Sequence, residues 1–148
     1  MSAKIIPMIP CSVAGPIGVK HLPRLWLKVS LEATGKLHPD YPGIGQGFDM
    51  MVISGLGLTA DAVRSFIAAK RPTYAAFEAW VKAQPGVKLD RASVYQLNQS
   101  IMGYHHDDET RQAILKAAGY PDNGSVSGSA VELNALDDWA AFHASELK

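Results

Sequence analysis

The sequence predicts a mostly α-helical protein, a compact single-domain bundle of about six or seven helices with one glycine-framed loop. Apolar residues recur at the three- and four-residue spacing of amphipathic helices, and strict apolar–polar alternation rarely extends beyond four positions. The chain has 148 residues, of which 47% are hydrophobic. That composition can bury one core but is too small for a second domain. We therefore treat residues 1–148 as one globular domain.

The first part of the chain, residues 1–19, is predicted to be extended. Pro7, Pro10 and Pro16 interrupt any helix there. The apolar run at residues 5–10 is far too short for a membrane span or for the core of a signal peptide. We expect a cytoplasmic protein with no membrane partner.

Helical segments with apolar residues at core spacing follow one another along the rest of the chain. Their predicted ranges are 21–35, 47–56, 59–71, 73–84, 90–102, 107–118 and a terminal helix that contains Leu136, Trp139 and Phe142. Side chains that cap helix starts precede four of them, namely Thr59, Thr73, Asp90 and Asp107 or Asp108. Residues 120–130 are rich in glycine and serine, which predicts a flexible connection before the terminal helix.

Charge and cysteine content limit the classes of partner. Acidic and basic residues balance at 14 each, with no block of like charge, so neither nucleic acid nor an anionic membrane is expected as a partner. Net neutrality is compatible with a homo-oligomer as well as with a monomer. Cys11 is the single cysteine, so no internal disulfide forms. We interpret it as a small packing residue or an exposed thiol, because no histidine stands close to it in sequence. The alternative is a nucleophile whose histidine partner is close only in the fold.

Residues 35–49 form the strongest candidate for a functional site, because glycines allow this loop of hydrogen-bonding side chains to bend. Tyr41 could donate to a developing oxyanion, while His38 or Asp40 moves a proton or contacts substrate. The alternative is an Asp-turn held by Pro39 and Pro42, with Tyr41 packed on the core. The sequence leaves both interpretations open.

Asp49 follows Phe48 at the start of a predicted apolar helix, which makes it a candidate general base with a pKa raised by Met-rich surroundings. The alternative is an acid favoured by the helix dipole. His21 and Arg24 lie three residues apart, so they pair an imidazole for proton transfer with a guanidinium for an anionic oxygen. Arg24 could equally clamp a loop carbonyl, Asp40 or Asp49.

The sequence favours no metal or cofactor. The run at residues 105–108 is His-His-Asp-Asp, but adjacent histidines on a helix point about 100° apart and no suitably spaced third ligand follows. We interpret the run as a helix cap with surface histidines. No Gly-x-Ser-x-Gly elbow and no phosphate or dinucleotide glycine motif is present.

Several short motifs resemble a bacterial family catalogued as a domain of unknown function. They are Leu22-Pro23-Arg24, Lys28, Gly35, Asp40-Tyr41, Gly45, Gly47-Phe48-Asp49 and Leu56-Gly57. The similarity extends to Ala79-Trp80-Val81 and to Asp137-Asp138-Trp139, so it runs from end to end. The resemblance implies a single-domain bacterial protein, and it implies no particular chemistry.

The chain also departs from the pattern of that family. Leu27 stands where the family has an aspartate, Ser30 replaces an arginine, and an apolar run at residues 50–53 stands where relatives have arginine and cysteine. If this face lines a pocket, the pocket is more apolar than in the family, which favours a hydrophobic substrate.

We therefore expect a cofactor-independent enzyme, a lyase, isomerase or hydrolase, that moves a proton on a small, partly apolar, aromatic or carboxylated substrate. Its predicted catalytic residues are Asp49, His21 and Tyr41. Its predicted substrate-binding residues are Arg24, His38, Asp40 and Phe48. The alternative is a non-catalytic ligand-binding or interaction module. A site also requires that residues 21–35 pack against residues 45–53.

Overall fold

A computed structural model describes residues 4–148 and confirms the predicted helical fold class. The described residues form helices α1 (Leu22–Ala33), α2 (Phe48–Leu56), α3 (Ala60–Lys70), α4 (Tyr74–Ala83), α5 (Arg91–Met102), α6 (Asp108–Ala118), α7 (Ala130–Phe142) and a final π-helical turn, η1 (His143–Leu147). Their β-type pairing is limited to isolated bridges.

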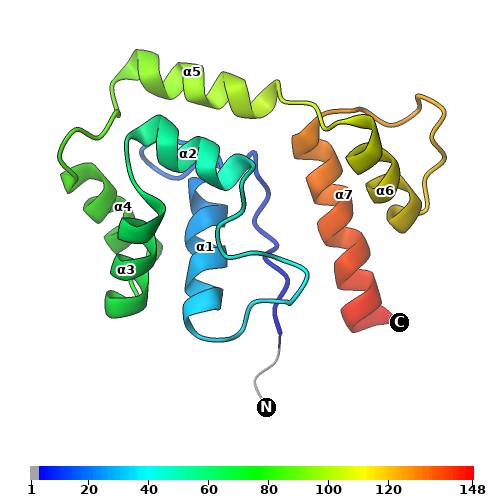
Figure 1. Ribbon diagram of the computed structural model, residues 1–148, viewed down its shortest axis with the longest axis horizontal. Helices are drawn as coiled ribbons and strands as arrows, with labels where there is room; N and C mark the ends of the chain where they lie inside the picture. The colour runs from blue at the N-terminus through cyan, green and yellow to red at the C-terminus, as the bar shows by residue number, and fades with distance from the viewer. Residues whose placement is uncertain (1–3) are drawn as a thin grey trace.

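The helices form two groups joined by α5 (Figure 1). Helix α1 is central to the first group, in which it contacts α2, α3 and α4. Helices α6 and α7 pack on each other as the second group, and α5 contacts both α2 and α7. The N-terminal segment runs beside α1, on the side that faces α7 (Figure 1). The space between α1 and α7 is therefore bordered by three segments that are distant in sequence.

Apolar burial holds each group together. The main core lies among α1 to α5 and includes Ala130 and Val131 at the start of α7. Its largest fully buried side chains include Leu22, Leu25, Ile53, Leu56 and Phe77. A separate small cluster, Ile114, Leu115 and Leu133, joins α6 to α7. Burying side chains of this size contributes roughly 1.5 to 3 kcal/mol each, so the smaller cluster holds the second group less firmly than the main core holds the first.

The predicted helix starts are confirmed by their caps. In each, the capping side chain accepts a hydrogen bond from the backbone N–H three residues on, which satisfies a donor that the first turn leaves free. The caps are Thr59 (3.2 Å), Thr73 (3.1 Å), Asp90 (3.0 Å) and Asp107 (2.7 Å). Of the two aspartates considered for α6, Asp107 is the cap.

The two segments that the sequence predicts to lack helices contain none in the structure. No helix forms in residues 4–20, and residues 120–129 connect α6 to α7 without regular structure. The flexibility of this connection stays a prediction. Residues 1–3 of the predicted extended segment lie outside the described residues.

Among the described helices, none alone is long and apolar enough to cross a membrane. Helices α2 and α3 meet that test of length and composition only as a pair, and this pair is bent by 96°.

The crossing of α2 and α5 depends on Gly55. A Cβ atom at this position would lie 2.9 Å from Leu97 Cδ1, which is closer than packed carbons approach. We expect Gly55→Val to lower the free energy of unfolding by about 1 to 3 kcal/mol through overpacking. Urea denaturation measures this change.

Leu97→Ala opens the space that the introduced valine side chain would need, so the double variant is expected to be more stable than the sum of the two single changes implies. The coupling should be about 0.5 kcal/mol or more in a double-mutant cycle. Additive effects of Gly55→Val and Leu97→Ala would contradict this account of the crossing.

Candidate functional site

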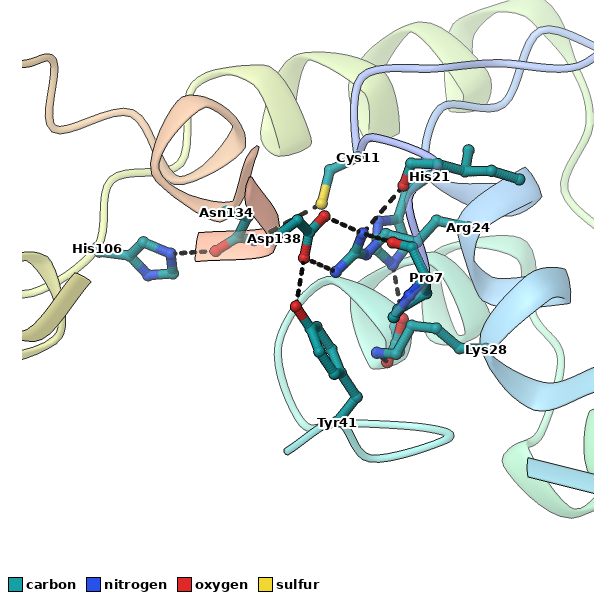
Figure 2. Close-up of polar contacts among 11 residues, drawn as sticks. Pro7, Cys11, His21, Arg24, Lys28, Tyr41, His106, Asn134 and Asp138 are labelled. Carbon is teal, nitrogen blue, oxygen red and sulfur yellow. Dashed lines mark hydrogen bonds and ion pairs between the residues drawn. The ribbon is translucent and has the colours of Figure 1, made fainter. Parts of the chain in front are cut away.

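A cleft of about 700 Å³ lies between the central helix and the second helical group. The N-terminal segment, α1, the loop before α2, α2 itself, the segment that leads into α6, and α7 all contribute to its lining. Figure 2 shows the polar side chains that meet here from these separate segments. A cleft of this size accommodates a small organic molecule.

Asp49, in the first turn of α2, is bound by two side chains from the first helix and its cap. Its Oδ1 lies 2.6 Å from His21 Nε2, and its Oδ2 accepts hydrogen bonds from Lys28 Nζ at 2.5 Å and from the backbone N–H of Gly45 at 2.8 Å. All three side chains are buried. The predicted packing of the first helix against residues 45–53 is therefore confirmed.

The ionisation of Asp49 follows from these contacts. Burial alone would raise its pKa, but the hydrogen bond from His21 and the charge of Lys28 lower the pKa of Asp49 to about 2. The predicted rise in this pKa is wrong, because the Met-rich surroundings are outweighed by these two donors. A carboxylate with such a low pKa holds a neighbouring cation well and is a poor proton acceptor near neutral pH.

His21 has an unusual backbone conformation at the start of α1. Its φ of 71° and ψ of −19° lie in the left-handed region, which a non-glycine residue rarely adopts. Its backbone N–H donates to the carbonyl oxygen of Val13 at 3.0 Å, which ties it to the N-terminal segment. Strain of this kind is typical of functional sites, where surrounding contacts fix a side chain in one direction.

The imidazole of His21 and the thiol of Cys11 are both buried and line the same cleft. Nδ1 is buried and makes no hydrogen bond with a described residue. The imidazole and the thiol are nevertheless close enough to shift each other's ionisation. Burial alone would raise the pKa of Cys11, but His21 and the charge of Arg24 hold this pKa below its usual value. Burial alone would lower the pKa of His21, but Asp49 and Cys11 raise it.

Arg24 links both walls of the cleft to α1 (Figure 2). Its guanidinium binds the carboxylate of Asp138 on α7 in a bidentate pair, with distances of 2.6 and 3.1 Å. Its Nη1 also donates to the carbonyl oxygens of Pro7 at 2.7 Å and Ile9 at 3.0 Å. Of the roles considered for Arg24, the clamp on loop carbonyls is present, with Asp138 as its carboxylate partner.

Asn134 connects Cys11 to the second helical group. Its Nδ2 donates to Cys11 Sγ at 3.6 Å, and its Oδ1 lies 2.8 Å from His106 Nε2. Because an amide oxygen only accepts, His106 Nε2 is the donor in this arrangement. The bond from His106 therefore keeps the amide N–H groups of Asn134 directed to the thiol.

The structure places most of the predicted site residues around this cleft. Those that line it are His21, Arg24, Asp40, Tyr41, Phe48 and Asp49. His38 does not line the cleft. Its ring packs against the ring of Tyr41, with the two centroids 5.9 Å apart, and its Nδ1 lies 3.9 Å from the Asp40 carboxylate. The Tyr41 hydroxyl donates to Asp138 at 2.9 Å, and burial together with Asp138 raises the pKa of Tyr41.

Several residues that complete the network are absent from the predicted site, namely Cys11, Lys28, Asn134, Asp138 and His106. One signal for Lys28 is its spacing from His21 and Arg24, since positions 21, 24 and 28 share one helix face. Polar residues on the face that also carries Leu25 indicate a buried network. Asn134 and Asp138 are four apart on α7, which is the same kind of signal.

The described residues contain no group of three or more histidine, cysteine or acidic side chains arranged to hold a metal ion. In the run predicted to be a helix cap, His106 binds Asn134, and His105 Nδ1 lies 3.1 Å from the carbonyl oxygen of Gly103. The expectation that the protein needs no metal stays a prediction.

Comparisons of the chain with models of protein families, with curated proteins and with solved structures find no match. The resemblance described above therefore stays a prediction, and the interpretation of the cleft depends on its geometry.

The low pKa of Asp49 makes stability depend on acid. Because the folded pKa of about 2 lies below the ordinary value of 3.8, the ionised carboxylate stabilises the fold above about pH 4. This contribution is lost as the pH falls toward 2. We expect the wild type to lose about 2 kcal/mol more unfolding free energy than Asp49→Asn between pH 5 and pH 2.

Urea denaturation at a series of pH values measures this difference. Asp61→Asn, at an exposed position of α3, is the matched control and should keep the wild-type acid dependence. An equal loss in the wild type and in Asp49→Asn would show that Asp49 is not held ionised by His21 and Lys28.

Proposed function

We propose that this protein is a cofactor-independent small-molecule enzyme that works by acid/base proton transfer, with Cys11 as nucleophile, His21 as proton carrier and Asp49 as the group that orients His21. One observation carries the proposal. Asp49 holds His21 through Nε2, while the buried Nδ1 makes no hydrogen bond with a described residue and the Cys11 thiol lines the same cleft. A nucleophile, a base and an orienting carboxylate in this order form a catalytic triad.

The two pKa shifts support a thiolate–imidazolium pair. The pKa of Cys11 is lowered and that of His21 is raised, so both shifts act to move the proton from the thiol toward the imidazole. The thiolate is the nucleophilic form of cysteine. Asp49, which stays ionised, stabilises the charge on His21 and takes no proton itself.

Of the three reaction types considered, this arrangement favours a hydrolase that acts on an acyl group. The Cys11 thiolate attacks the acyl carbonyl carbon to form a C–S bond, and the leaving group departs with the proton of His21. Water then attacks the thioester while His21 accepts the proton of the water. The C–S bond breaks, the acid product leaves, and the thiolate–imidazolium pair is restored.

Asn134 is the neighbouring side chain suited to stabilise the oxyanion, because its amide donates toward Sγ and is fixed by His106. The sequence predicts this role for Tyr41, whose hydroxyl instead donates to Asp138. The apolar part of the lining, which includes Phe48, Met50 and Met51, fits a partly apolar substrate.

Arg24 acts in this proposal as a positioning residue. The guanidinium is already occupied by Asp138 and by two backbone carbonyls, so it offers little to a carboxylate of the substrate. Arg24→Ala would therefore mainly change how the walls of the cleft are held together, and it would have less effect on the binding of a substrate carboxylate.

A non-catalytic ligand-binding module is the second candidate, and one observation favours it. Cys11 is only 1% exposed, so its thiol could serve to pack the N-terminal segment against α1 and α7. The two candidates differ in the reactivity of this thiol.

The pH dependence of alkylation by iodoacetamide tests the proposal, because Cys11 is the only thiol in the chain. The midpoint of the rate profile reports the pKa of the thiol independently of its accessibility. We expect a midpoint below that of the urea-unfolded chain. In His21→Asn the midpoint should rise by about one unit or more, with about tenfold slower alkylation at pH 7.

Asparagine is chosen at position 21 because it tolerates a left-handed backbone. His105→Asn, at an exposed position, is the matched control and should leave the profile unchanged. If the thiol of the folded protein does not react, or titrates as in the unfolded chain, the binding-module proposal becomes the better one. A thioester on Cys11, detected by intact mass spectrometry after incubation with an activated ester, would support acyl transfer directly.

A further inference from the structure

The outer part of the cleft carries carboxylates without cationic partners. Asp40, in the loop before α2, has a side chain that is 79% exposed and approaches only His38, at 3.9 Å. The side chain of Asp137, on α7, forms no hydrogen bond or ion pair with any described residue. These two side chains come from segments about 100 residues apart, and both line the cleft that contains Cys11.

The cations of the same cleft are already neutralised. Arg24 pairs with Asp138, and Lys28 pairs with Asp49. Two cationic side chains, Arg24 and Lys28, line the cleft, but carboxylates outnumber them among its lining residues. A thiolate–imidazolium pair adds no net charge. The field that a bound molecule meets is therefore negative.

The carboxylates of this rim repel one another. Burial, Asp138 and Asp40 together raise the pKa of Asp137, while Arg24 and His106 offset only part of the effect. A positive group placed between Asp40 and Asp137 would relieve this repulsion. Aromatic rings stand nearby, since Tyr104 and Phe48 also line the cleft in an edge-to-face pair with centroids 5.7 Å apart. Such rings attract ammonium groups through their faces.

An independent feature identifies the inner end of this cleft as a place for a ligand. His21 is 2% exposed, lines the cleft, and leaves Nδ1 without a hydrogen bond from the described residues. A buried polar nitrogen without a partner is costly unless a ligand or a reacting group uses it. The acidic rim thus lies at the outer end of a site that has a reactive inner end.

We propose that the substrate of the Cys11 centre is an acyl compound that carries a cationic amine, an ammonium or quaternary ammonium group, which Asp40 and Asp137 bind. This inference rests on the proposed function and adds to it the chemical class of the substrate. It replaces the expectation of a carboxylated substrate, because the carboxylate-binding role assigned to Arg24 is taken by Asp138.

The test compares three small reagents that differ in charge and share one reaction. These are the 2-aminoethyl, 2-hydroxyethyl and 2-sulfonatoethyl methanethiosulfonates, which are cationic, neutral and anionic. In each reaction the thiolate attacks the sulfenyl sulfur, a disulfide bond forms, the bond to the sulfonyl sulfur breaks, and methanesulfinate leaves. Rates on the folded protein at pH 7 are divided by the rates of 2-mercaptoethanol with the same reagents.

We expect the normalised rate for the cationic reagent to exceed that for the anionic reagent by about tenfold or more. In the double variant Asp40→Asn/Asp137→Asn this ratio should fall close to that of the free thiol, while the rate for the neutral reagent changes little. Both positions are exposed, so the fold should be retained.

The control variant Asp61→Asn/Asp90→Asn removes the same net charge outside the cleft, and asparagine also caps a helix at position 90. It should keep the wild-type ratio. A preference that falls equally in the control would reflect net charge rather than the rim, and would overturn the inference.

The remaining outcomes separate this inference from the proposed function. If Cys11 reacts with all three reagents in the ratio of the free thiol, or prefers the anion, the cationic substrate is excluded and the reactive centre stands. If none of the reagents modifies Cys11 in the folded protein, the proposed function fails, and the inference fails with it.

Discussion

The buried guanidinium of Arg24 is the interaction on which the shape of the cleft depends. It binds the N-terminal segment through the carbonyl oxygens of Pro7 and Ile9, and it binds α7 through Asp138. Burying this charge costs several kcal/mol, which the bidentate carboxylate and the two carbonyls offset. The small apolar cluster of α6 and α7 does not reach α1, and α7 joins the main core only through Ala130 and Val131 at its start. Farther along α7, at Asp138, this polar clamp holds the two walls together. Arg24 therefore determines the geometry of the site without having to contact a ligand.

One face of α1 and its cap organises the charges of the whole site. His21, Arg24 and Lys28 project from this face, and each meets a carboxylate of another helix: Asp49 of α2 or Asp138 of α7. Because each strong cation is paired, its field does not extend far into the cleft. The groups that remain without a partner are then His21 Nδ1 at the inner end and the side chain of Asp137 at the rim. In the function that we propose, this separation places the chemistry at one end of the cleft and recognition of the substrate at the other.

The local features of the fold could be predicted from the sequence, whereas the chemistry of the site could not. Thr59 and Thr73 cap helices through atoms three residues away, so their pattern is visible in a short window. The pKa of Asp49 instead depends on His21 and Lys28, which are 28 and 21 residues away, and a short window around Asp49 omits both. The sequence does not single out Cys11, because its partner His21 follows ten residues later, across a backbone reversal with Gly18 at φ 82°. The sequence also predicts His38 as a site residue because it lies in the glycine-framed loop. In the structure the ring of His38 packs on Tyr41 and does not line the cleft.

The backbone of His21 shows why this residue type matters at the start of α1. A left-handed conformation costs a side chain with a Cβ roughly 1 to 2 kcal/mol, and glycine or asparagine would adopt it more readily. Neither of these could place one ring nitrogen 2.6 Å from the Asp49 carboxylate and keep a second ring nitrogen buried in the cleft that Cys11 lines. The backbone hydrogen bond to Val13 and the pair with Asp49 hold the ring in spite of the strain. At this strained position, one imidazole nitrogen is bound and the other has no hydrogen bond. A packing residue would not need the second nitrogen, so a reactive role explains His21 better than packing does.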